Sequence, residues 1–252
     1  MKKDISVIIQ GPLDNQTYEA IDSYTDQGFD EIIVSTWEDS DLAYLERTKN
    51  DYHLIVSEYD IDSTYNNEGY RYFQSTTINK ACQKATKKYC LKTRSDELYP
   101  NLDRMISNLT DYPERIHTTN NGFWTFESKK IPACFSSHLY IAPTDQLLEA
   151  SQNAIDNCTG KNFSHLNFIC TEQLYGYFLM LSRGFDLTKD DWKEVFRNNI
   201  FITPCGELPG HLHSGCTFLR NYLSHTRLTN YPYDRPDGHH PAHLYFHHEQ
   251  IA

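Results

Sequence analysis

The stretch from Tyr89 to Leu98, YCLKTRSDEL, places cationic and acidic side chains directly after a short apolar segment. Lys92 and Arg94 can neutralise phosphate charge, while Asp96 and Glu97 offer the hard oxygen ligands that divalent metal ions prefer. If the apolar segment is a strand, these side chains stand at its carboxyl end, where open α/β sheets usually bind their ligands. The stretch therefore predicts a site for a diphosphate and a divalent metal.

Two earlier apolar segments also stop abruptly in polar residues. They read ISVIIQGP, residues 5–12, and EIIVSTWEDSD, residues 31–41. The candidate ligand-binding residues at these two ends are Gln10, Gly11, Pro12, Ser35, Thr36 and Trp37. Gly11 allows close approach of a backbone, and Pro12 fixes the turn, although a plain strand-ending turn explains Pro12 equally well.

Alternating strand and helix patterns position these three ends. Apolar runs predict strands at 5–10, 31–36, 52–57 and 89–92, and apolar residues at helical spacing predict helices at 18–28, 41–49 and 68–88. Such alternation predicts right-handed crossovers and an α/β fold with a mainly parallel central sheet flanked by helices.

The second half of the chain is less regular. It predicts helices at 100–109, 144–154 and 171–181 and strands at 115–118 and 137–141, where the pairing could be antiparallel. From Pro204 onward glycine, proline, histidine and tyrosine accumulate. We therefore expect residues 1–203 to form the main domain and residues 204–252 to form a loop-rich extension packed on it.

Composition excludes several classes of protein. The net charge is −11, with 23 Lys and Arg against 34 Asp and Glu, which argues against nucleic acid as a partner. No apolar run approaches the roughly 20 residues of a transmembrane segment, and MKKDIS lacks the apolar region of a signal peptide, so we expect a cytoplasmic protein. The seven cysteines are scattered without a CxxC pair, which favours buried free thiols.

Taken together, ISVIIQGP, IIVSTWEDSD and LKTRSDE resemble the WavE family of lipopolysaccharide-synthesis proteins. More distantly, they resemble nucleotide-sugar-dependent glycosyltransferases of the GT-A fold, a Rossmann-like α/β architecture. The resemblance covers the three motifs and is loose in the C-terminal half. It implies transfer of a sugar from a nucleotide diphosphate sugar, by default a UDP-sugar, to a saccharide or lipid-linked glycan acceptor. It also implies a role in surface-polysaccharide synthesis. A lipid-linked acceptor would bring the protein into peripheral contact with the membrane.

The resemblance divides the main domain into a donor half, residues 1–110, and an acceptor half, residues 111–203. The implied donor-binding residues are Gln10, Gly11, Pro12, Ser35, Thr36, Trp37, Lys92, Arg94, Ser95 and Asp96. At the second strand end, hydroxyls can bind a ribose and the indole of Trp37 can cover a base, although an ordinary core position for Trp37 is an equal rival.

The metal is the least complete part of the resemblance. GT-A enzymes commonly carry Asp-x-Asp where this chain has RSDE, so Asp96 matches, the first position is Arg94 or Ser95 instead of a carboxylate, and Glu97 is named as a second oxygen ligand. His211 and His213 are named as further ligands of Mn²⁺ or Mg²⁺, because several GT-A enzymes complete their site with a C-terminal histidine. One alternative is that Asp96 binds the donor ribose or sugar hydroxyls while Lys92 and Arg94 neutralise the phosphates. The other is that Arg94 and Asp96 form a mere surface ion pair.

A base is needed to take the proton of the acceptor hydroxyl if the transferase inverts the anomeric carbon. Glu172 stands at the start of the helix predicted over 171–181 and is the first candidate, with Asp190 and Asp191 in reserve. An acidic residue in a first helical turn is often only a dipole or capping feature, which is the rival interpretation. The alternatives in function are a sugar nucleotidyltransferase, for which GPLDNQ lacks the usual glycine-rich basic loop, and a noncatalytic carbohydrate-binding protein.

Overall fold

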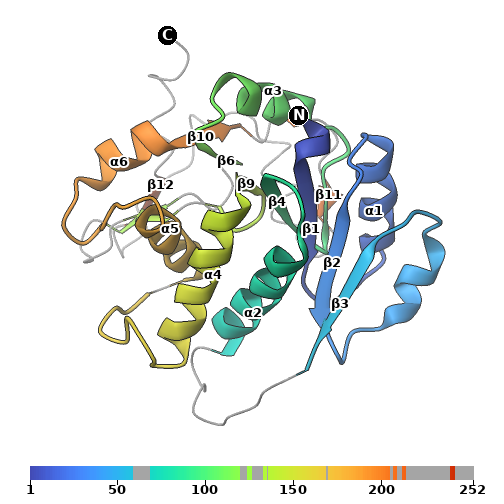
Figure 1. Cartoon of the computed structure of the whole chain (residues 1–252), viewed down its shortest axis with the longest axis horizontal. Coiled ribbons are helices and arrows are strands. Elements are labelled where there is room, and N and C mark those ends of the chain that lie inside the picture. Colours follow the sequence, from blue (N-terminus) through green and yellow to red (C-terminus); the bar gives the residue numbers. More distant parts are fainter. Residues whose placement is uncertain are drawn as a thin grey trace.

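A seven-stranded mixed sheet forms the centre of the protein in the computed structural model (Figure 1). The structure describes residues 1–58, 69–119, 124–126, 133–134, 136–168, 170–204, 207–208, 212–213 and 239–241. The strand order is β10-β6-β9-β4-β1-β2-β3. The strands are β1 (Ile5–Gln10), β2 (Ile32–Trp37), β3 (His53–Ser57), β4 (Tyr89–Arg94), β6 (Ile116–Thr119), β9 (Tyr140–Pro143) and β10 (Ile200–Thr203).

All of these strands run parallel except β9, which pairs antiparallel with both β4 and β6. The predicted α/β fold with a mainly parallel sheet is therefore confirmed. The antiparallel pairing expected in the second half is confined to β9 within this sheet, because β6 and β10 run with the strands of the first half.

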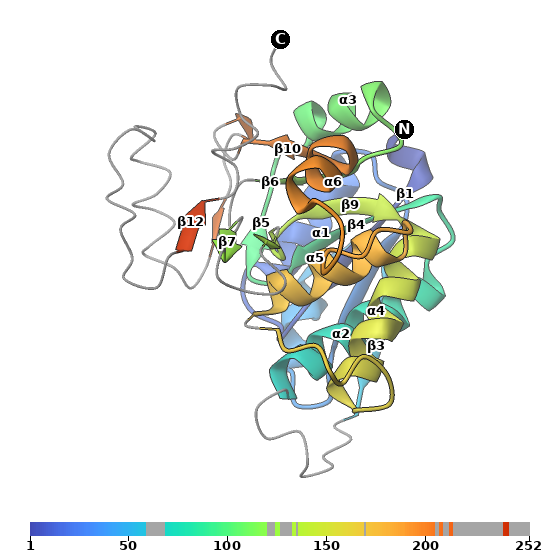
Figure 2. The same cartoon turned by 90° about the vertical axis from the view of Figure 1, so that its left-hand side faces the viewer.

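Helices cover both faces of the sheet (Figures 1 and 2). The helices are η1 (Lys2–Asp4), α1 (Thr17–Asp26), η2 (Leu42–Arg47), α2 (Gly69–Lys84), α3 (Asp103–Asp111), α4 (Thr144–Cys158), α5 (Thr171–Leu181) and α6 (Trp192–Asn199). Successive β1 residues point to opposite faces. Ile8 joins the apolar cluster under α2, α4 and α5, whereas Val7 and Ile9 join the cluster under α1 and α3. Burial on both sides explains why β1 is a continuous apolar run.

Short strands form two small additional sheets. One pairs β5 (Glu97–Leu98) with β11 (Leu212–His213), and the other joins β7 (Trp124–Phe126) to β8 (Ala133–Cys134) and β12 (His239–Pro241). Two described pieces of the C-terminal region thus pair with strands from earlier in the chain. The predicted boundary at residue 204 remains a prediction.

Several element boundaries differ from the sequence-based expectations. The strand expected over 137–141 begins at Tyr140, so Ser137 precedes it, and β4 continues to Arg94 rather than ending at Lys92. The short helix expected over 41–49 is a 3-10 helix. The sequence reasoning missed α6 and β10 altogether.

Two other expectations concern the cysteines and the membrane. The thiols of Cys82, Cys90, Cys158 and Cys170 are free, and the first three are buried. No helix in the described part of the chain is both long and apolar enough to cross a membrane.

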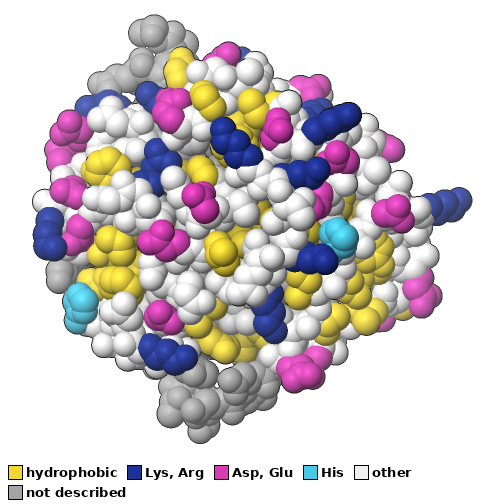
Figure 3. All heavy atoms as spheres, in the orientation of Figure 1, with side chains coloured by type: hydrophobic (Ala, Val, Ile, Leu, Met, Phe, Trp, Pro, Cys, Tyr) yellow, Lys and Arg dark blue, Asp and Glu magenta, His cyan; other side chains and the backbone are white. Residues whose placement is uncertain are grey.

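Charged side chains of both signs are interspersed over the face shown in Figure 3. Apolar side chains gather over the edge strand β3 at the right of that view, where Leu54 and Val56 are 40% and 41% exposed.

Candidate functional site

A cavity of about 490 Å³ opens at the carboxyl ends of the central strands. Its lining residues are Gln10, Gly11, Pro12, Leu13, Asp14, Trp37, Phe73, Gln74, Arg94, Ser95, Asp96, Ser137 and Glu172. They come from the ends of β1, β2 and β4, from the early turns of α2 and α5, and from the segment before β9. Because β9 is antiparallel, its start lies at the edge of the sheet where the parallel strands end. The three strand ends predicted from sequence therefore do meet.

Ser95 ties the end of β4 to the end of β1 and so builds the floor of the cavity. Its backbone N–H donates to the Gln10 carbonyl at 3.0 Å, and its hydroxyl donates to the Pro12 carbonyl at 2.5 Å. Between these contacts Gly11 has a φ of +133°, and a Cβ added there would lie 2.7 Å from the Ser95 hydroxyl oxygen. Gly11 is therefore required by close approach to Ser95 and by its backbone conformation.

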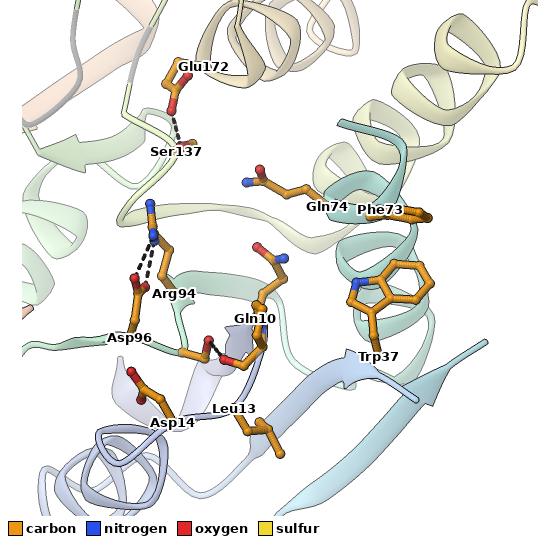
Figure 4. Close-up of a pocket in the computed structure, with 13 residues that line it drawn as sticks. Gln10, Leu13, Asp14, Trp37, Phe73, Gln74, Arg94, Asp96, Ser137 and Glu172 are labelled. Atoms are coloured by element: carbon orange, nitrogen blue, oxygen red, sulfur yellow. Dashed lines mark hydrogen bonds and ion pairs between the residues drawn. The ribbon is translucent and has the colours of Figure 1, made fainter. Parts of the chain in front are cut away.

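Arg94 and Asp96 form a bidentate ion pair on the cavity wall (Figure 4). Arg94 Nε lies 2.8 Å from Asp96 Oδ1, and Nη2 lies 2.7 Å from Oδ2. Burial lowers the pKa of Arg94, but the hydrogen bonds and charge of Asp96 outweigh it and raise that pKa overall. The pair that sequence reasoning weighed as a mere surface feature does form, and it supplies the cavity with a guanidinium that stays charged.

An aromatic pair occupies another side of the cavity. The rings of Trp37 and Phe73 meet edge to face with centroids 4.8 Å apart, and Trp37 is only 5% exposed. Trp37 is thus both a core residue and part of the lining, so its two rival interpretations are compatible. Figure 4 shows the amides of Gln10 and Gln74 between this pair and the Arg94 side. Phe73 and Gln74 were not predicted as site residues.

The two hydroxyls predicted at the end of β2 do not line the cavity. Ser35 is fully buried and donates to the Thr77 carbonyl at 2.8 Å, while the Thr36 hydroxyl lies 2.5 Å from that of Ser40. Their predicted contact with a ribose stays a prediction.

Glu172 is the second residue of α5, and its carboxylate lines the cavity. The Ser137 hydroxyl donates to Glu172 Oε1 at 2.5 Å (Figure 4). The carboxylate therefore has a fixed partner at the cavity, in addition to its favourable place at a helix N-terminus. Ser137 was not predicted as a site residue, because its role depends on where the loop before β9 lies.

Lys92 and Glu97 are buried and are not among the residues that line the cavity. Lys92 is fully buried, donates to the Ser137 carbonyl and lies 5.9 Å from the centroid of the Tyr140 ring. Glu97 is fully buried as well; it accepts a hydrogen bond from the Tyr99 hydroxyl at 2.8 Å and pairs with the His138 ring. Burial first, and then the charge of Arg94, lower the pKa of Lys92 to about 7.

The predicted metal ligands are only partly brought together. The backbone of His213 lies opposite that of Glu97 in the β11–β5 pair, and His211 lies outside the described residues. Both oxygens of Asp96 accept hydrogen bonds from Arg94. Among the residues that the structure describes, no group of three or more His, Cys, Asp and Glu side chains could hold a metal ion. The described part alone does not fit the predicted metal site.

Asp191, the reserve candidate for the base, begins α6. Its side chain accepts a hydrogen bond from the Lys193 backbone N–H at 3.0 Å, as an N-cap residue does. It is not among the cavity-lining residues.

Comparison with known proteins gives distant structural likenesses. No known protein family and no curated protein sequence matches the chain. Among solved structures, HddC from Yersinia pseudotuberculosis is 10% identical, with 79% of this chain and 89% of that chain covered and a TM-score of 0.42. The mannosyltransferase PcManGT from Pyrobaculum calidifontis, in complex with GDP-Man and Mn²⁺, is 17% identical, with coverages of 57% and 45% and a TM-score of 0.40. This chain spans less than half the length of the mannosyltransferase.

Proposed function

We propose that the protein is a nucleotide-sugar-dependent glycosyltransferase of GT-A type that acts in surface-glycan synthesis. The observation that carries the proposal is the composition of the cavity at the strand ends. Its aromatic pair suits a nucleobase, and its permanently charged guanidinium suits a diphosphate. Its carboxylate at a helix start suits an acceptor hydroxyl. Its volume of about 490 Å³ suits a ligand of nucleotide size.

In the proposed donor complex, the nucleobase of the donor lies against Trp37 and Phe73, where the Gln10 and Gln74 amides can bind the polar edge of the nucleobase. The diphosphate lies near Arg94, whose planar guanidinium binds two phosphate oxygens as readily as it now binds Asp96. The resemblance of the three sequence motifs makes a UDP-sugar the default donor and a saccharide or lipid-linked glycan the acceptor.

The proposed chemical step is a single displacement with inversion. Glu172 takes the proton of the acceptor hydroxyl while the oxygen of that hydroxyl bonds to the anomeric carbon of the donor sugar. The bond from that carbon to the diphosphate oxygen breaks, and the nucleoside diphosphate leaves with the bonding electron pair. Arg94 stabilises the negative charge that develops on the leaving group.

Metal dependence is a separate part of the proposal. The cavity is lined by the carboxylates of Asp14, Asp96 and Glu172 and by the guanidinium of Arg94, so a diphosphate adds negative charge to an acidic lining. A divalent ion supplies charge neutralisation of the leaving diphosphate when it is bound. The described residues do not complete a site for it, so experiments must compare nucleotide binding with and without metal.

Calorimetry with UDP, GDP, CMP and dTDP, each with and without Mn²⁺, tests the donor site. We expect a nucleoside diphosphate to bind, and Arg94→Met to weaken that binding by about tenfold or more, as loss of a charge-assisted hydrogen bond does. The matched control is Arg104→Met, because Arg104 pairs with Glu207 and does not line the cavity. Absence of binding by every nucleotide would refute the transferase proposal.

Product analysis then separates the enzyme classes. Incubation with a nucleotide sugar and a glycan acceptor should release a nucleoside diphosphate. Formation of a nucleotide sugar and pyrophosphate from a sugar phosphate and a nucleoside triphosphate would instead identify a nucleotidyltransferase. Binding of glycans without nucleotide would identify a carbohydrate-binding protein.

A further inference from the structure

We infer that Lys92 and Ser137 are positioning residues, with Lys92 fixing the backbone of Ser137 so that the Ser137 hydroxyl orients the Glu172 carboxylate toward the acceptor. This inference rests on the proposed function, because the role of Glu172 as a base belongs to it. It reassigns Lys92 from the donor site, where sequence reasoning put it, to the support of the base.

The first link is the hydrogen bond from Ser137 to Glu172. The Ser137 hydroxyl donates to Glu172 Oε1 at 2.5 Å. In this inference the other carboxylate oxygen, Oε2, takes the acceptor proton. A carboxylate near the start of a helix can otherwise adopt several rotamers. The hydroxyl therefore selects one orientation of the base at the cavity wall.

The second link holds Ser137 itself. Lys92 Nζ donates to the Ser137 carbonyl, and the ring of the next residue, His138, pairs with the buried Glu97. The His138 backbone N–H also donates to the Ser136 hydroxyl at 3.1 Å. The loop before β9 thus makes two contacts with the β4–β5 segment and one within itself, and the Ser137 hydroxyl contacts Glu172.

Burial separates Lys92 from the ligand. Its side chain is fully inaccessible and does not line the cavity, whereas Arg94, two residues further along the same strand, does. The groups that face the Lys92 ammonium are the Arg94 guanidinium, the carboxylates of Asp96, Glu97 and Glu172, and the Tyr140 ring. The neutral amine and the ammonium both donate an N–H to a carbonyl, so the contact with Ser137 is retained when Lys92 titrates.

Steady-state kinetics of four variants test the inference. We expect Ser137→Ala to lower kcat by about tenfold with the donor affinity unchanged, because it removes one hydrogen bond to a charged group. Ser137→Thr keeps the hydroxyl and should recover most of the activity. Lys92→Met should lower kcat in the same way. The kcat of the double variant Lys92→Met/Ser137→Ala should equal that of the less active single variant, since both substitutions act through one contact.

The matched control is Ser151→Ala, which removes another buried serine hydroxyl, in α4, that contacts Asn79 and does not line the cavity. It should leave kcat unchanged. An unchanged kcat in Ser137→Ala would overturn the inference. Weaker binding of a nucleoside diphosphate by Lys92→Met would also overturn it, because Lys92 would then be a donor-binding residue.

A crystal structure of each variant gives a readout that does not need activity. We expect the Glu172 carboxylate to leave its position in Ser137→Ala and the Ser137 carbonyl to shift in Lys92→Met. An undisturbed Glu172 in both variants would overturn the inference even if the wild-type protein transferred no sugar. Absence of nucleotide binding by the wild-type protein would instead refute the proposed function. If Lys92→Met does not fold, the Ser137→Ala and Ser137→Thr pair decides.

Discussion

At the scale of single residues, Gly11 matters because a side chain has no room there. Gly11→Ala would place a methyl group 2.7 Å from the Ser95 hydroxyl oxygen and force a φ of +133° on a residue with a Cβ. We expect a loss of about 1–3 kcal/mol in the free energy of unfolding, together with weaker nucleotide binding, because the floor of the cavity must shift. Urea unfolding and calorimetry measure the two effects.

The control for this change is Gly28→Ala, after α1. Gly28 also has a positive φ, of +89°, but an added Cβ would meet nothing within 4 Å. This control should lower stability while leaving nucleotide affinity intact. Equal nucleotide affinity in the Gly11→Ala protein and the wild type would show that the cavity floor tolerates displacement.

Lys92 should also make stability depend on pH. Its pKa in the folded protein is lowered to about 7, below the value of about 10.4 in an unfolded chain. Between these values the unfolded state binds a proton that the folded state does not, so the contribution of Lys92 to the free energy of unfolding increases as pH rises from 7 to 10. We expect Lys92→Met to flatten this increase, measured by urea unfolding at pH 7 and pH 9.

The comparison for that experiment is Lys3→Met at an exposed position, which removes a lysine charge without changing the core. It should preserve the wild-type slope of stability against pH. A Lys92→Met slope equal to that of the wild type would mean that the buried amine is not responsible.

Most of the residues that line the cavity could be predicted from residue types at the strand ends. Which side chains reach the cavity and which are buried within the sheet could not. Gln10, Trp37, Arg94 and Asp96 line the cavity as the motifs indicated. Lys92 does not, because β4 continues two residues beyond its predicted end and so carries Lys92 into the sheet. Side-chain types mark the edge of a sheet, whereas hydrogen bonding to neighbouring strands decides where each strand stops.

At the scale of elements, α6 illustrates a helix that sequence reasoning overlooked. Only eight residues long, it follows the N-cap Asp191 and buries Val195 and Phe196 on one side. Its apolar residues make too few turns to establish a helical period from sequence alone. Residue type alone makes Asp191 a candidate catalytic base, whereas the structure gives it a capping hydrogen bond.

Asp191→Ala separates capping from catalysis. We expect a loss of about 0.5–2 kcal/mol in the free energy of unfolding with kcat unchanged, because the lost N-cap bond belongs to a residue that does not line the cavity. Asp191→Asn keeps a capping oxygen and should be nearly as stable as the wild type. A large fall in kcat for both variants, with stability kept in Asp191→Asn, would restore Asp191 as a base.

Tertiary placement of elements explains why Phe73, Gln74 and Ser137 were missed. The first two belong to an early turn of α2, and Ser137 lies just before the antiparallel β9. None of the three follows an apolar strand, so the strand-end pattern could not select them. Their approach to the cavity depends on how α2 crosses the sheet and on the direction of β9, which the local sequence pattern leaves open.

At the scale of the whole molecule, the two predicted halves share one sheet. β9 lies between β4 from the first half and β6 from the second, and pairs with both. The helices α2 and α4, one from each half, also contact each other. The two predicted halves therefore belong to one continuous core, and the cavity receives Arg94 from one half and Glu172 from the other.

The position of β9 also sets an order of events during protein synthesis. The strands β1 to β4 emerge from the ribosome first and can pair among themselves, but one edge of β4 has no partner until residues 140–143 have been made. Exposed strand edges of this kind invite pairing with other chains. Slow translation between β4 and β9 should therefore favour aggregation of the nascent chain through this edge. The edge is no longer available once β9 pairs antiparallel with β4.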